Sequence, residues 1–296
     1  MRETGRNMKY KYIVDYKDNQ ILRNSFNELA VKTFAINFNN WYEKALWENQ
    51  YIPYSLADGN KIVANASVNI MNFQQDGIHK NYIQIGTIMT DEAYRGQGLS
   101  RYLMEHILAE YKEKVDGIYL FANDTVLEFY PKFGFKAIQE YEYSKTIPEL
   151  NSVYKVEKVD MSDKSNWDKL LCASSYAPVN VRLSMNNKGL LGFWVTSFKK
   201  ESIYYIPEEE AYIIADTEEE TLIIEELFAK QRLDLGKVAK SFGDKIKTVK
   251  LHFTPYITEG YTLTPYKEDD CTLFIMGDQL ESIEKEKLKF PTLSHA

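Results

Sequence analysis

Residues 90–100 read T-D-E-A-Y-R-G-Q-G-L-S and place two glycines, Gly96 and Gly98, directly before a segment with helical periodicity. The first backbone N–H groups of a helix have no acceptor within it, and the helix dipole leaves partial positive charge there. Glycines at this point let the chain turn sharply and let an anion approach the amides without meeting a Cβ atom. Arg95 adds a fixed positive charge. The stretch predicts a phosphate site, the alternative being a glycine-rich turn that merely starts a helix.

The segments on either side of this stretch fit such a site. Y-I-Q-I-G-T-I-M-T, residues 82–90, has the apolar run of a buried strand. After the glycines, apolar residues recur at helical spacing, at Leu99, Tyr102, Leu103, Ile107, Leu108 and Tyr111. Two other phosphate-binding loops are excluded, because the stretch has neither G-K-[ST] nor G-x-G-x-x-G.

Further out, the first half alternates strands and helices. D-G at Asp58-Gly59 predicts a hairpin between two strands. Helices are predicted over residues 19–34 and 39–47 and a short one around 126–130, with strands at 9–14, 117–122 and 135–143. The order is that of a mixed α/β fold with mostly antiparallel strands.

A similar order restarts after a polar joint at residues 147–153. Ser165 is the predicted N-cap of a helix over 166–172, and another helix is predicted over 235–242. Strands are predicted at 154–159, 192–198, 202–206, 211–216, 221–228 and 249–253. We therefore expect two domains, residues 1–146 and 153–296, the second resembling the first in order of elements.

Composition excludes several classes of function. The 296 residues, 44% of them hydrophobic, suffice for a sizeable core, and a net charge of −7 gives no basic surface for nucleic acid. Cys172 and Cys271 are far apart and suggest neither a disulfide framework nor a thiolate metal site. No apolar run approaches the ~18 residues that a membrane span requires. A cytoplasmic protein without a membrane or nucleic-acid partner is expected.

The central stretch resembles the acyl-CoA-binding motif of the GCN5-related N-acetyltransferase (GNAT) family, [QR]-x-x-G-x-[GA]. Arg95, Gly98 and Ser100 occupy its three defining places, with Ser100 departing from the usual Gly or Ala. A second similarity follows in A-N-D-T-V-L-E-F-Y-P-K-F-G-F, residues 122–135, which resembles the family's segment ending F-Y-x-x-x-G-F. The resemblance covers roughly residues 8–145 and implies a GNAT fold there, with a degenerate GNAT-like domain after it.

The resemblance implies how acetyl-CoA would bind. The strand that ends at Ile88, Met89 and Thr90 is expected to splay from its neighbour and pair with the pantetheine amides, since unpaired buried backbone groups are costly. The pyrophosphate would lie on the loop formed by Arg95, Gly96, Gln97, Gly98, Leu99 and Ser100. Asn123 would bond the pantetheine arm, the alternative being a turn-forming Asn in N-D-T.

Tyr130 is the catalytic residue that the resemblance implies, as the phenol that protonates the departing thiolate. The alternative is a core aromatic, which is also the expectation for Phe129, Phe133 and Phe135. The general base stays open: Glu92, His79 and His106 are candidates, but solvated surface roles fit them better. The histidines, at 79, 106, 252 and 295, lack metal-ligand spacing, so no metal is predicted.

The second half has no R-x-x-G-x-G, and its acidic runs at 208–210 and 218–220 read as solvated turns. An intact copy followed by a silent one also resembles the first two domains of Eis-type acetyltransferases, without room for their third. We expect acetyl transfer to a primary amine of unknown identity. The alternatives are a non-catalytic acyl-CoA-binding sensor and, disfavoured by the acidic charge, an aminoacyl-tRNA-dependent acyltransferase.

The acceptor amine and the oligomeric state are not determined by the sequence. Substrate contacts in the family come from variable helices and strand loops, which here are residues 39–47 and 71–80. Trp41, Tyr42 and Trp47 are candidates to line the pocket, the alternative being the core.

Overall fold

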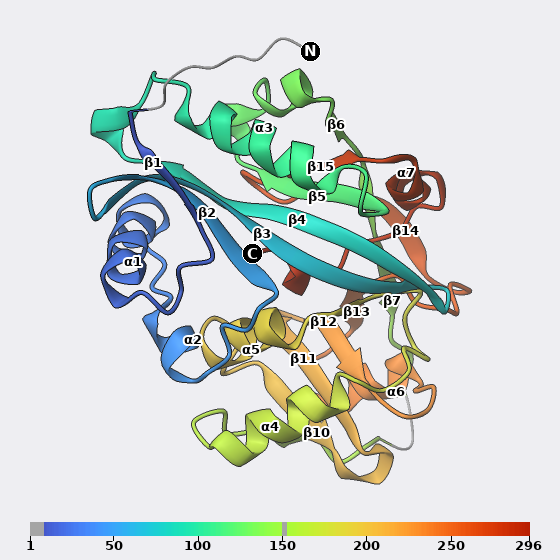
Figure 1. Ribbon diagram of the computed structural model, residues 1–296. Helices are drawn as coiled ribbons and strands as arrows, with labels where there is room; N and C mark the ends of the chain where they lie inside the picture. The colour runs from blue at the N-terminus through green and yellow to red at the C-terminus, as the bar shows by residue number, and fades with distance from the viewer. Residues whose placement is uncertain (1–8, 150–152) are drawn as a thin grey trace.

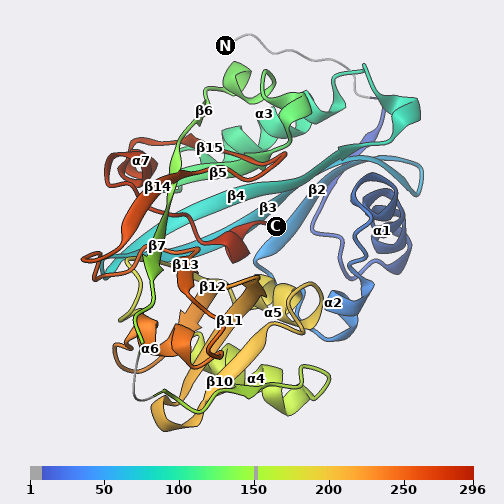
Figure 2. The ribbon, with the colours of Figure 1, turned by 180° about the vertical axis from the view of Figure 1, so that it is seen from behind.

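The computed structural model describes residues 9–149 and 153–296 as two mixed sheets with helices on their faces (Figures 1 and 2). The predicted mixed α/β class with mostly antiparallel strands is confirmed. Of the strand pairs within the described residues, only β4–β5 and β12–β13 are parallel. Each of these pairs is joined by a helical crossover, α3 in the first and α6 in the second.

The first sheet has the order β1-β2-β3-β4-β5-β15-β6, with β9 paired to the far end of β3. Its strands are β1 (Lys11–Val14), β2 (Tyr51–Asp58), β3 (Lys61–Gln75), β4 (Ile78–Thr90), β5 (Gly117–Ala122), β6 (Lys136–Ala137), β9 (Leu183–Asn186) and β15 (Thr272–Met276). The predicted D-G hairpin joins β2 to β3, with Gly59 at φ +61°.

Helices α1 (Gln20–Phe34) and α3 (Leu99–Tyr111) cover opposite faces of this sheet. Successive strand residues point to opposite faces, so Met71 and Phe73 lie on the face that α1 helps to cover and belong to the same hydrophobic cluster, while Ala66 and Val68 belong to the cluster of α3. Asn19 caps α1 by accepting from the first amides of the helix, as its place before an apolar-periodic segment predicts. The site described below lies where α3 begins and α1 ends.

The second sheet has the order β14-β7-β13-β12-β11-β10-β8. Its strands are β7 (Glu140–Thr146), β8 (Glu157–Lys158), β10 (Ile203–Ile206), β11 (Ala211–Glu218), β12 (Thr221–Phe228), β13 (Thr248–Leu251) and β14 (Thr262–Tyr266). The remaining helices are α2 (Asn39–Glu43), α4 (Lys164–Ala173), α5 (Lys188–Thr196), α6 (Leu235–Lys240) and α7 (Glu281–Lys285). Short 3₁₀ turns occupy Glu92–Tyr94, Asp124–Val126, Tyr130–Phe133, Pro207–Glu209, Asp278–Leu280 and Thr292–Ser294.

The two sheets exchange strands. The single strand predicted over 135–143 is wrong: it divides into β6, which stays in the first sheet, and β7, which pairs with β13 and β14 in the second. In return β15, near the end of the chain, inserts between β5 and β6. Figures 1 and 2 both show β6 in the upper part of the molecule and β7 below it, beside β13. The expected boundary at residues 147–153 therefore separates segments of sequence, whereas the sheets interleave across it; residues 150–152 lie outside the described part.

Four local predictions are wrong. In place of the short helix predicted around 126–130 the chain forms two 3₁₀ turns, Asp124–Val126 and Tyr130–Phe133. Residues 192–198 lie mostly in helix α5, because this apolar run is buried on several sides and Asn187 caps its first turn. Asp163, not Ser165, caps α4 by accepting from the Ser165 amide at 2.8 Å. The helix predicted over 39–47 ends at Glu43, since Ala45 adopts a left-handed φ of +57°.

Candidate active site

Strands β4 and β5 diverge and open a wedge between them. They pair only from Tyr82 to Gln84 on β4 and Gly117 to Tyr119 on β5, although β4 runs on to Thr90 against β3. A bulge in β4 spans Thr87 and Ile88, with Thr87 at φ +49°. The far end of β4 therefore turns backbone groups toward a gap in place of a neighbouring strand.

A cavity of about 650 Å³, the wedge cavity, occupies this gap and the start of α3. It is lined by ten of the eleven residues proposed from the sequence: Ile88, Met89, Thr90, Arg95, Gly96, Gly98, Leu99, Ser100, Asn123 and Tyr130. Gln97 does not line it; its side-chain oxygen accepts from the Tyr10 hydroxyl at 2.9 Å. Phe34, at the end of α1, and Phe129 also line the wedge cavity.

The loop before α3 has the geometry that an anion site requires. Gly96 and Gly98 lie at φ +77° and +78°, the left-handed region where other residues are strained, and a Cβ atom at either would point into open space. Gly98 is the N-cap and provides no side-chain acceptor, so the first amides of this 13-residue helix lack a cap. The Arg95 side chain is 62% exposed and its only ion-pair partner among the described residues is Glu92 at 4.0 Å, which leaves the guanidinium accessible.

Ser100, the departure from the family motif, fits this loop. Its hydroxyl lies 2.8 Å from the Thr90 hydroxyl, so the side chain ties the start of α3 to the end of β4. A small polar residue is thus accommodated by bonding to the strand, and the loop keeps its open face.

Asn123 is held by Asp270, a residue from the turn before β15. The Asn123 amide donates to the Asp270 carboxylate at 2.9 Å and to its carbonyl oxygen at 3.3 Å, while the Asp124 backbone N–H donates to the other carboxylate oxygen at 2.7 Å. These hydrogen bonds hold the pKa of Asp270 below its usual range. Asp270, almost 150 residues away in the sequence, therefore fixes the position of the Asn123 side chain at the wall of the cavity.

Tyr130 begins the 3₁₀ turn Tyr130–Phe133 and is 5% exposed. Burial raises the pKa of its phenol to about 12, so the hydroxyl keeps its proton near neutral pH. Its ring packs against Phe129, Phe135 and Phe274. Among residues 9–149 and 153–296 the hydroxyl has no hydrogen-bond partner, which leaves it available to a bound molecule.

A second cavity, of about 330 Å³, adjoins the wedge cavity; we call it the aromatic pocket. Phe34, Ile88, Asn123 and Tyr130 line both cavities, so Tyr130 lies at their junction. Other walls of the aromatic pocket come from both halves of the chain, and include Phe38, Trp41, Tyr51, Phe121, Leu190, Phe193, Trp194, Phe198, His295 and Ala296.

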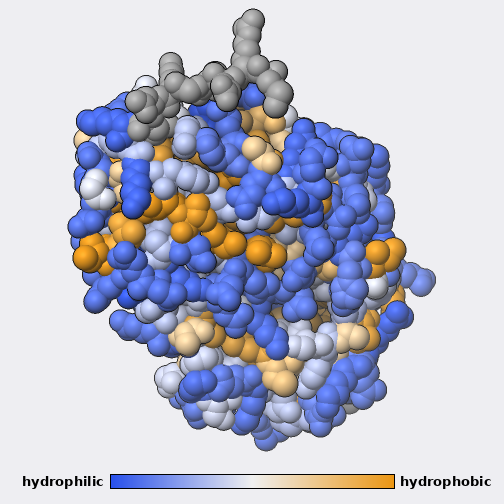
Figure 3. Space-filling view, viewed as in Figure 1, coloured by the Kyte–Doolittle hydropathy of each residue, from blue (hydrophilic) through white to orange (hydrophobic). Residues whose placement is uncertain are grey.

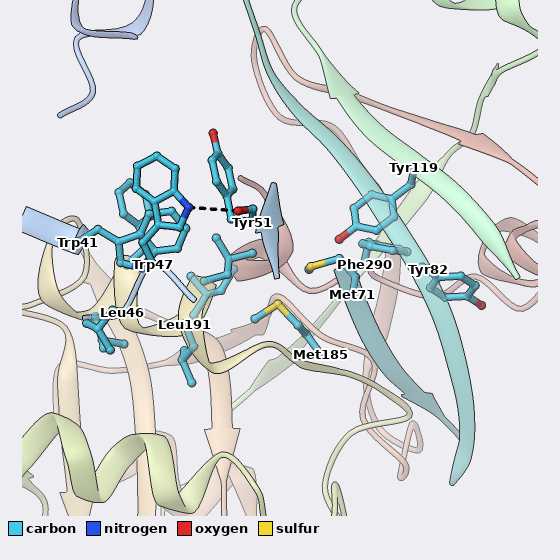
Figure 4. Close-up of a cluster of buried hydrophobic side chains, with 14 of the residues drawn as sticks. Trp41, Leu46, Trp47, Tyr51, Met71, Tyr82, Tyr119, Met185, Leu191 and Phe290 are labelled. Carbon is cyan, nitrogen blue, oxygen red and sulfur yellow. Dashed lines mark hydrogen bonds between the residues drawn. The ribbon is translucent and has the colours of Figure 1, made fainter. Parts of the chain in front are cut away.

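Of the candidate pocket aromatics, Trp41 lines the aromatic pocket, whereas Trp47 does not line it but packs against Trp41. The Trp41 and Trp47 rings are stacked at 5.4 Å, and the Trp47 indole donates to the Tyr51 carbonyl at 3.1 Å (Figure 4). Tyr42 is not among the lining residues; its ring packs edge-on against Trp47 and under the Arg23 guanidinium.

Comparison with known proteins places these features in a family. Residues 20–135 match the model of the acetyltransferase (GNAT) family. This region is a GNAT domain. The chain thus carries an acyltransferase domain whose matched region spans the wedge, the loop before α3 and Tyr130. No curated protein matches the sequence.

Solved structures share the fold at low sequence identity. A probable N-acyltransferase from Enterococcus faecalis V583 aligns over 93% of this chain and 74% of its own, with 15% identity and a TM-score of 0.57. Eis1 from Mycobacterium abscessus aligns over 90% and 73%, with 11% identity and a TM-score of 0.59. A GCN5-related N-acetyltransferase from Kribbella flavida aligns over 90% and 71%, with 15% identity and a TM-score of 0.54. The likeness extends beyond the GNAT domain into the second sheet.

The three candidate bases lie away from the junction of the cavities. Glu92 is exposed beside Lys32 and Arg95 and lines neither cavity, and His79 and His106 are exposed on the β3–β4 hairpin and on α3. In the described chain, no group of three His, Cys, Asp or Glu residues is placed to hold a metal ion, and no helix is long and apolar enough to cross a membrane.

Sequence reasoning missed the contributions from the end of the chain. His295 lines the aromatic pocket and packs against Phe121 with ring centroids 4.5 Å apart, and burial lowers its pKa to about 4. Gly86 allows this segment to approach β4, because a Cβ atom there would overlap the Ala296 carbonyl oxygen. Gly86 in an apolar strand was the available signal, since a glycine inside a strand often marks close approach of another backbone.

Proposed function

We propose that the protein transfers an acetyl group from acetyl-CoA to a primary amine by direct attack. The observation that carries this proposal is the junction of the two cavities at Tyr130. Acetyl-CoA would lie in the wedge cavity and the amine in the aromatic pocket. Their reacting ends would then meet beside a buried phenol that keeps its proton.

The residues of the wedge cavity fit acetyl-CoA. The uncapped amides of Gly98, Leu99 and Ser100 would receive the pyrophosphate, whose charge the start of α3 and Arg95 favour. Backbone groups of Ile88, Met89 and Thr90 would pair with the pantetheine arm, replacing the strand that β4 lacks on that side. Asn123, oriented by Asp270, would bond the same arm with its side-chain oxygen.

Tyr130 would serve as the general acid. When the neutral amine nitrogen attacks the thioester carbonyl carbon, a C–N bond forms and the C–S bond breaks. The sulfur leaves with the electron pair of that bond and receives the proton of the Tyr130 hydroxyl. The amine nitrogen releases one proton, which reaches solvent through water, and the same solvent reprotonates Tyr130. No fixed base is required in this scheme, in agreement with the distant positions of Glu92, His79 and His106.

The second sheet is proposed to be a degenerate GNAT-like copy that binds no CoA. This proposal is supported by its parallel pair with a helical crossover, by the absence of R-x-x-G-x-G, and by the wall that α5 gives to the aromatic pocket. One chain would then bind one acetyl-CoA.

The alternative is a sensor that binds acyl-CoA without turnover. Calorimetry with acetyl-CoA, followed by measurement of amine-dependent thiol release and of the acetylated amine by mass spectrometry, separates the two. Binding together with product formation supports the enzyme. Binding without product from any primary amine supports the sensor, and absence of binding contradicts both.

A further inference from the structure

We infer that the amine accepted in the aromatic pocket is a primary amine on one aromatic or apolar body, such as an arylalkylamine, in preference to polyamines and aminoglycosides. This inference rests on the proposed function. It concerns the chemistry of the pocket walls, which differ sharply from those of the wedge cavity.

The side chains that line the aromatic pocket carry no charge. Its eighteen lining residues include no Asp, Glu, Lys or Arg, and seven are Phe or Trp. His295 is the one ionisable imidazole among them, and because burial lowers its pKa to about 4 it is neutral near pH 7. No side chain of the lining offers a carboxylate to the second or third ammonium group of a polyamine, and the main-chain carboxyl group of Ala296 at the wall meets at most one of them. The free energy that an ammonium group gains from contact with aromatic rings is smaller than the free energy it loses when it is buried without a charged partner.

The polar atoms of these aromatic side chains are already bonded within the protein. The Trp41 indole donates to the Gly189 carbonyl at 2.8 Å, the Trp194 indole donates to the His295 carbonyl at 3.0 Å, and the Tyr51 hydroxyl donates to Thr87 at 2.8 Å. The rings are therefore held in position along the wall of the cavity. Such walls select a flat or branched apolar group by burial of its surface.

The Tyr130 hydroxyl and the Asn123 side-chain oxygen, neither of which has a hydrogen-bond partner among the described residues, lie at one end of the pocket. This is the end at which the pocket meets the wedge cavity. An amine with its nitrogen at this end would place its body against Phe38, Trp41 and Phe193, on the side away from the junction. The volume, about 330 Å³, lies at the lower end of the usual range of about 300–1,000 Å³ for ligand pockets, which favours a body of one ring system.

Phe198 gives a position from which to reverse this preference. It lines the pocket yet is 58% exposed, and it packs on Phe193 and Trp194 at 5.7 and 5.6 Å. Figure 3 shows patches of apolar surface among the hydrophilic residues of the face seen in Figure 1. Ile78, on the β3–β4 hairpin, is a comparable apolar residue for a control: it is 62% exposed and lines neither cavity. Phe198→Glu adds a carboxylate at the pocket, and Ile78→Glu adds the same charge elsewhere.

The test is the kcat/KM for acetylation of phenethylamine, hexylamine, spermidine and kanamycin with acetyl-CoA. We expect phenethylamine to exceed spermidine and kanamycin by at least about tenfold, a difference of ~1.4 kcal/mol in transition-state binding. Phe198→Glu should lower the phenethylamine value at least about fivefold and narrow its lead over spermidine, whereas Ile78→Glu should change neither. A kcat/KM for spermidine or kanamycin equal to that for phenethylamine would overturn the inference.

If the protein turns over none of these amines, binding of the amines to the pocket provides a second test of the inference. Trp41 and Trp194 line the pocket, so their fluorescence reports on its occupancy. Quenching by phenethylamine but not by spermidine, lost in Phe198→Glu and kept in Ile78→Glu, would support the pocket chemistry while the proposed transfer fails. Equal quenching by both amines, or none by either, would overturn it.

Discussion

The chain builds a parallel strand pair with a helical crossover twice, and the space between the diverging strands differs: the cavity of the second pair, about 360 Å³, is smaller and is partly walled by a segment of the chain itself. In the first pair, β4 and β5, that space is the wedge cavity. In the second, β12 and β13, the segment Asn180–Arg182 bridges the two ends. Arg182 donates its backbone N–H to Thr254 and Asn180 accepts from the Tyr256 amide, while the Asn180 side chain bonds to Gln231 and Leu233.

The two crossover helices also differ in how their first backbone amides are capped. Helix α3 begins at Gly98 with no side-chain cap, whereas α6 begins at Asp234, whose carboxylate accepts from the Gly236 and Lys237 amides at 2.9 and 3.1 Å. A carboxylate at the N-terminus of a helix occupies the place that a phosphate would take. Backbone groups that the second sheet satisfies with its own chain are thus left for a ligand in the first.

The largest effect is expected from closing the open loop with Gly98→Val. A branched side chain at φ +78° is strained, and it points into the space where the pyrophosphate is proposed to lie. We expect the Kd for acetyl-CoA, measured by calorimetry, to rise at least about 100-fold, or ~2.7 kcal/mol. Gly59→Val is the matched control, because it puts the same side chain at φ +61°, also in open space, on the β2–β3 turn. Unchanged affinity in folded Gly98→Val would remove the loop from the cofactor site.

The bridge in the second wedge is tested by Asn180→Ala. Asn180 is 8% exposed and bonds to both Gln231 and Leu233, so its loss removes two part-buried hydrogen bonds, one to the Gln231 carbonyl and one from the Leu233 amide. We expect the free energy of unfolding in urea to fall by about 1–3 kcal/mol. Asn166→Ala, which removes one exposed hydrogen bond to Asp160, should cost less. The parent protein should bind one acetyl-CoA per chain; two would contradict the contrast between the wedges.

Tyr130→Phe tests whether the open wedge also carries the chemical step. The ring and its packing remain, and only the hydroxyl that protonates the thiolate is lost. We expect kcat to fall at least about tenfold, or ~1.4 kcal/mol, with an unchanged Kd for acetyl-CoA. Tyr205→Phe, on the second sheet and away from both cavities, is the control. Turnover equal to the parent, where chemistry limits the rate, would make Tyr130 a core residue.

The pH profile gives Tyr130 a second signature. Burial raises its pKa to about 12, so the phenol stays protonated as the pH rises and loses its proton only near that value. The activity of the parent should therefore not decline through loss of this proton below about pH 10, where an unperturbed tyrosine would be half ionised. A fall in kcat with a midpoint near pH 8, absent from Tyr130→Phe, would contradict the raised pKa.

The sequence predicted those features of the site that depend only on residues close together in the chain. The stretch at 90–100 gave the left-handed glycines and the start of α3, because turn and cap chemistry act over a few residues. The strand exchange was not predictable, since alternation at 135–143 specifies a strand but not which sheet receives it. The aromatic pocket was not predictable either. The α5 segment was predicted as a strand because periodicity does not separate a buried helix from a buried strand. Phe34, Phe193 and His295 are far apart in the sequence and come to line one pocket only in the folded chain.

The smallest effect is expected where the second half reaches back to the first wedge, at Asp270. This residue, at φ +54° in the turn before β15, is tied to Asn123 and to the Asp124 amide. Asp270→Gly keeps the backbone conformation accessible and removes only the carboxylate, which its lowered pKa keeps ionised at neutral pH. Asn123 would then be free to rotate, and we expect the KM for acetyl-CoA to rise about threefold, or ~0.65 kcal/mol, with a smaller change in kcat.

Asp269→Gly, one residue earlier in the same turn, is the control because no hydrogen bond of its side chain is found among the described residues. Asn123→Ala should raise the KM as much as Asp270→Gly, and the double variant should add little, because both changes remove one contact. Fully additive effects would mean that Asp270 acts on the wedge by another route. An unchanged KM in both single variants would mean that the exchanged strand closes the first sheet without positioning anything in the site.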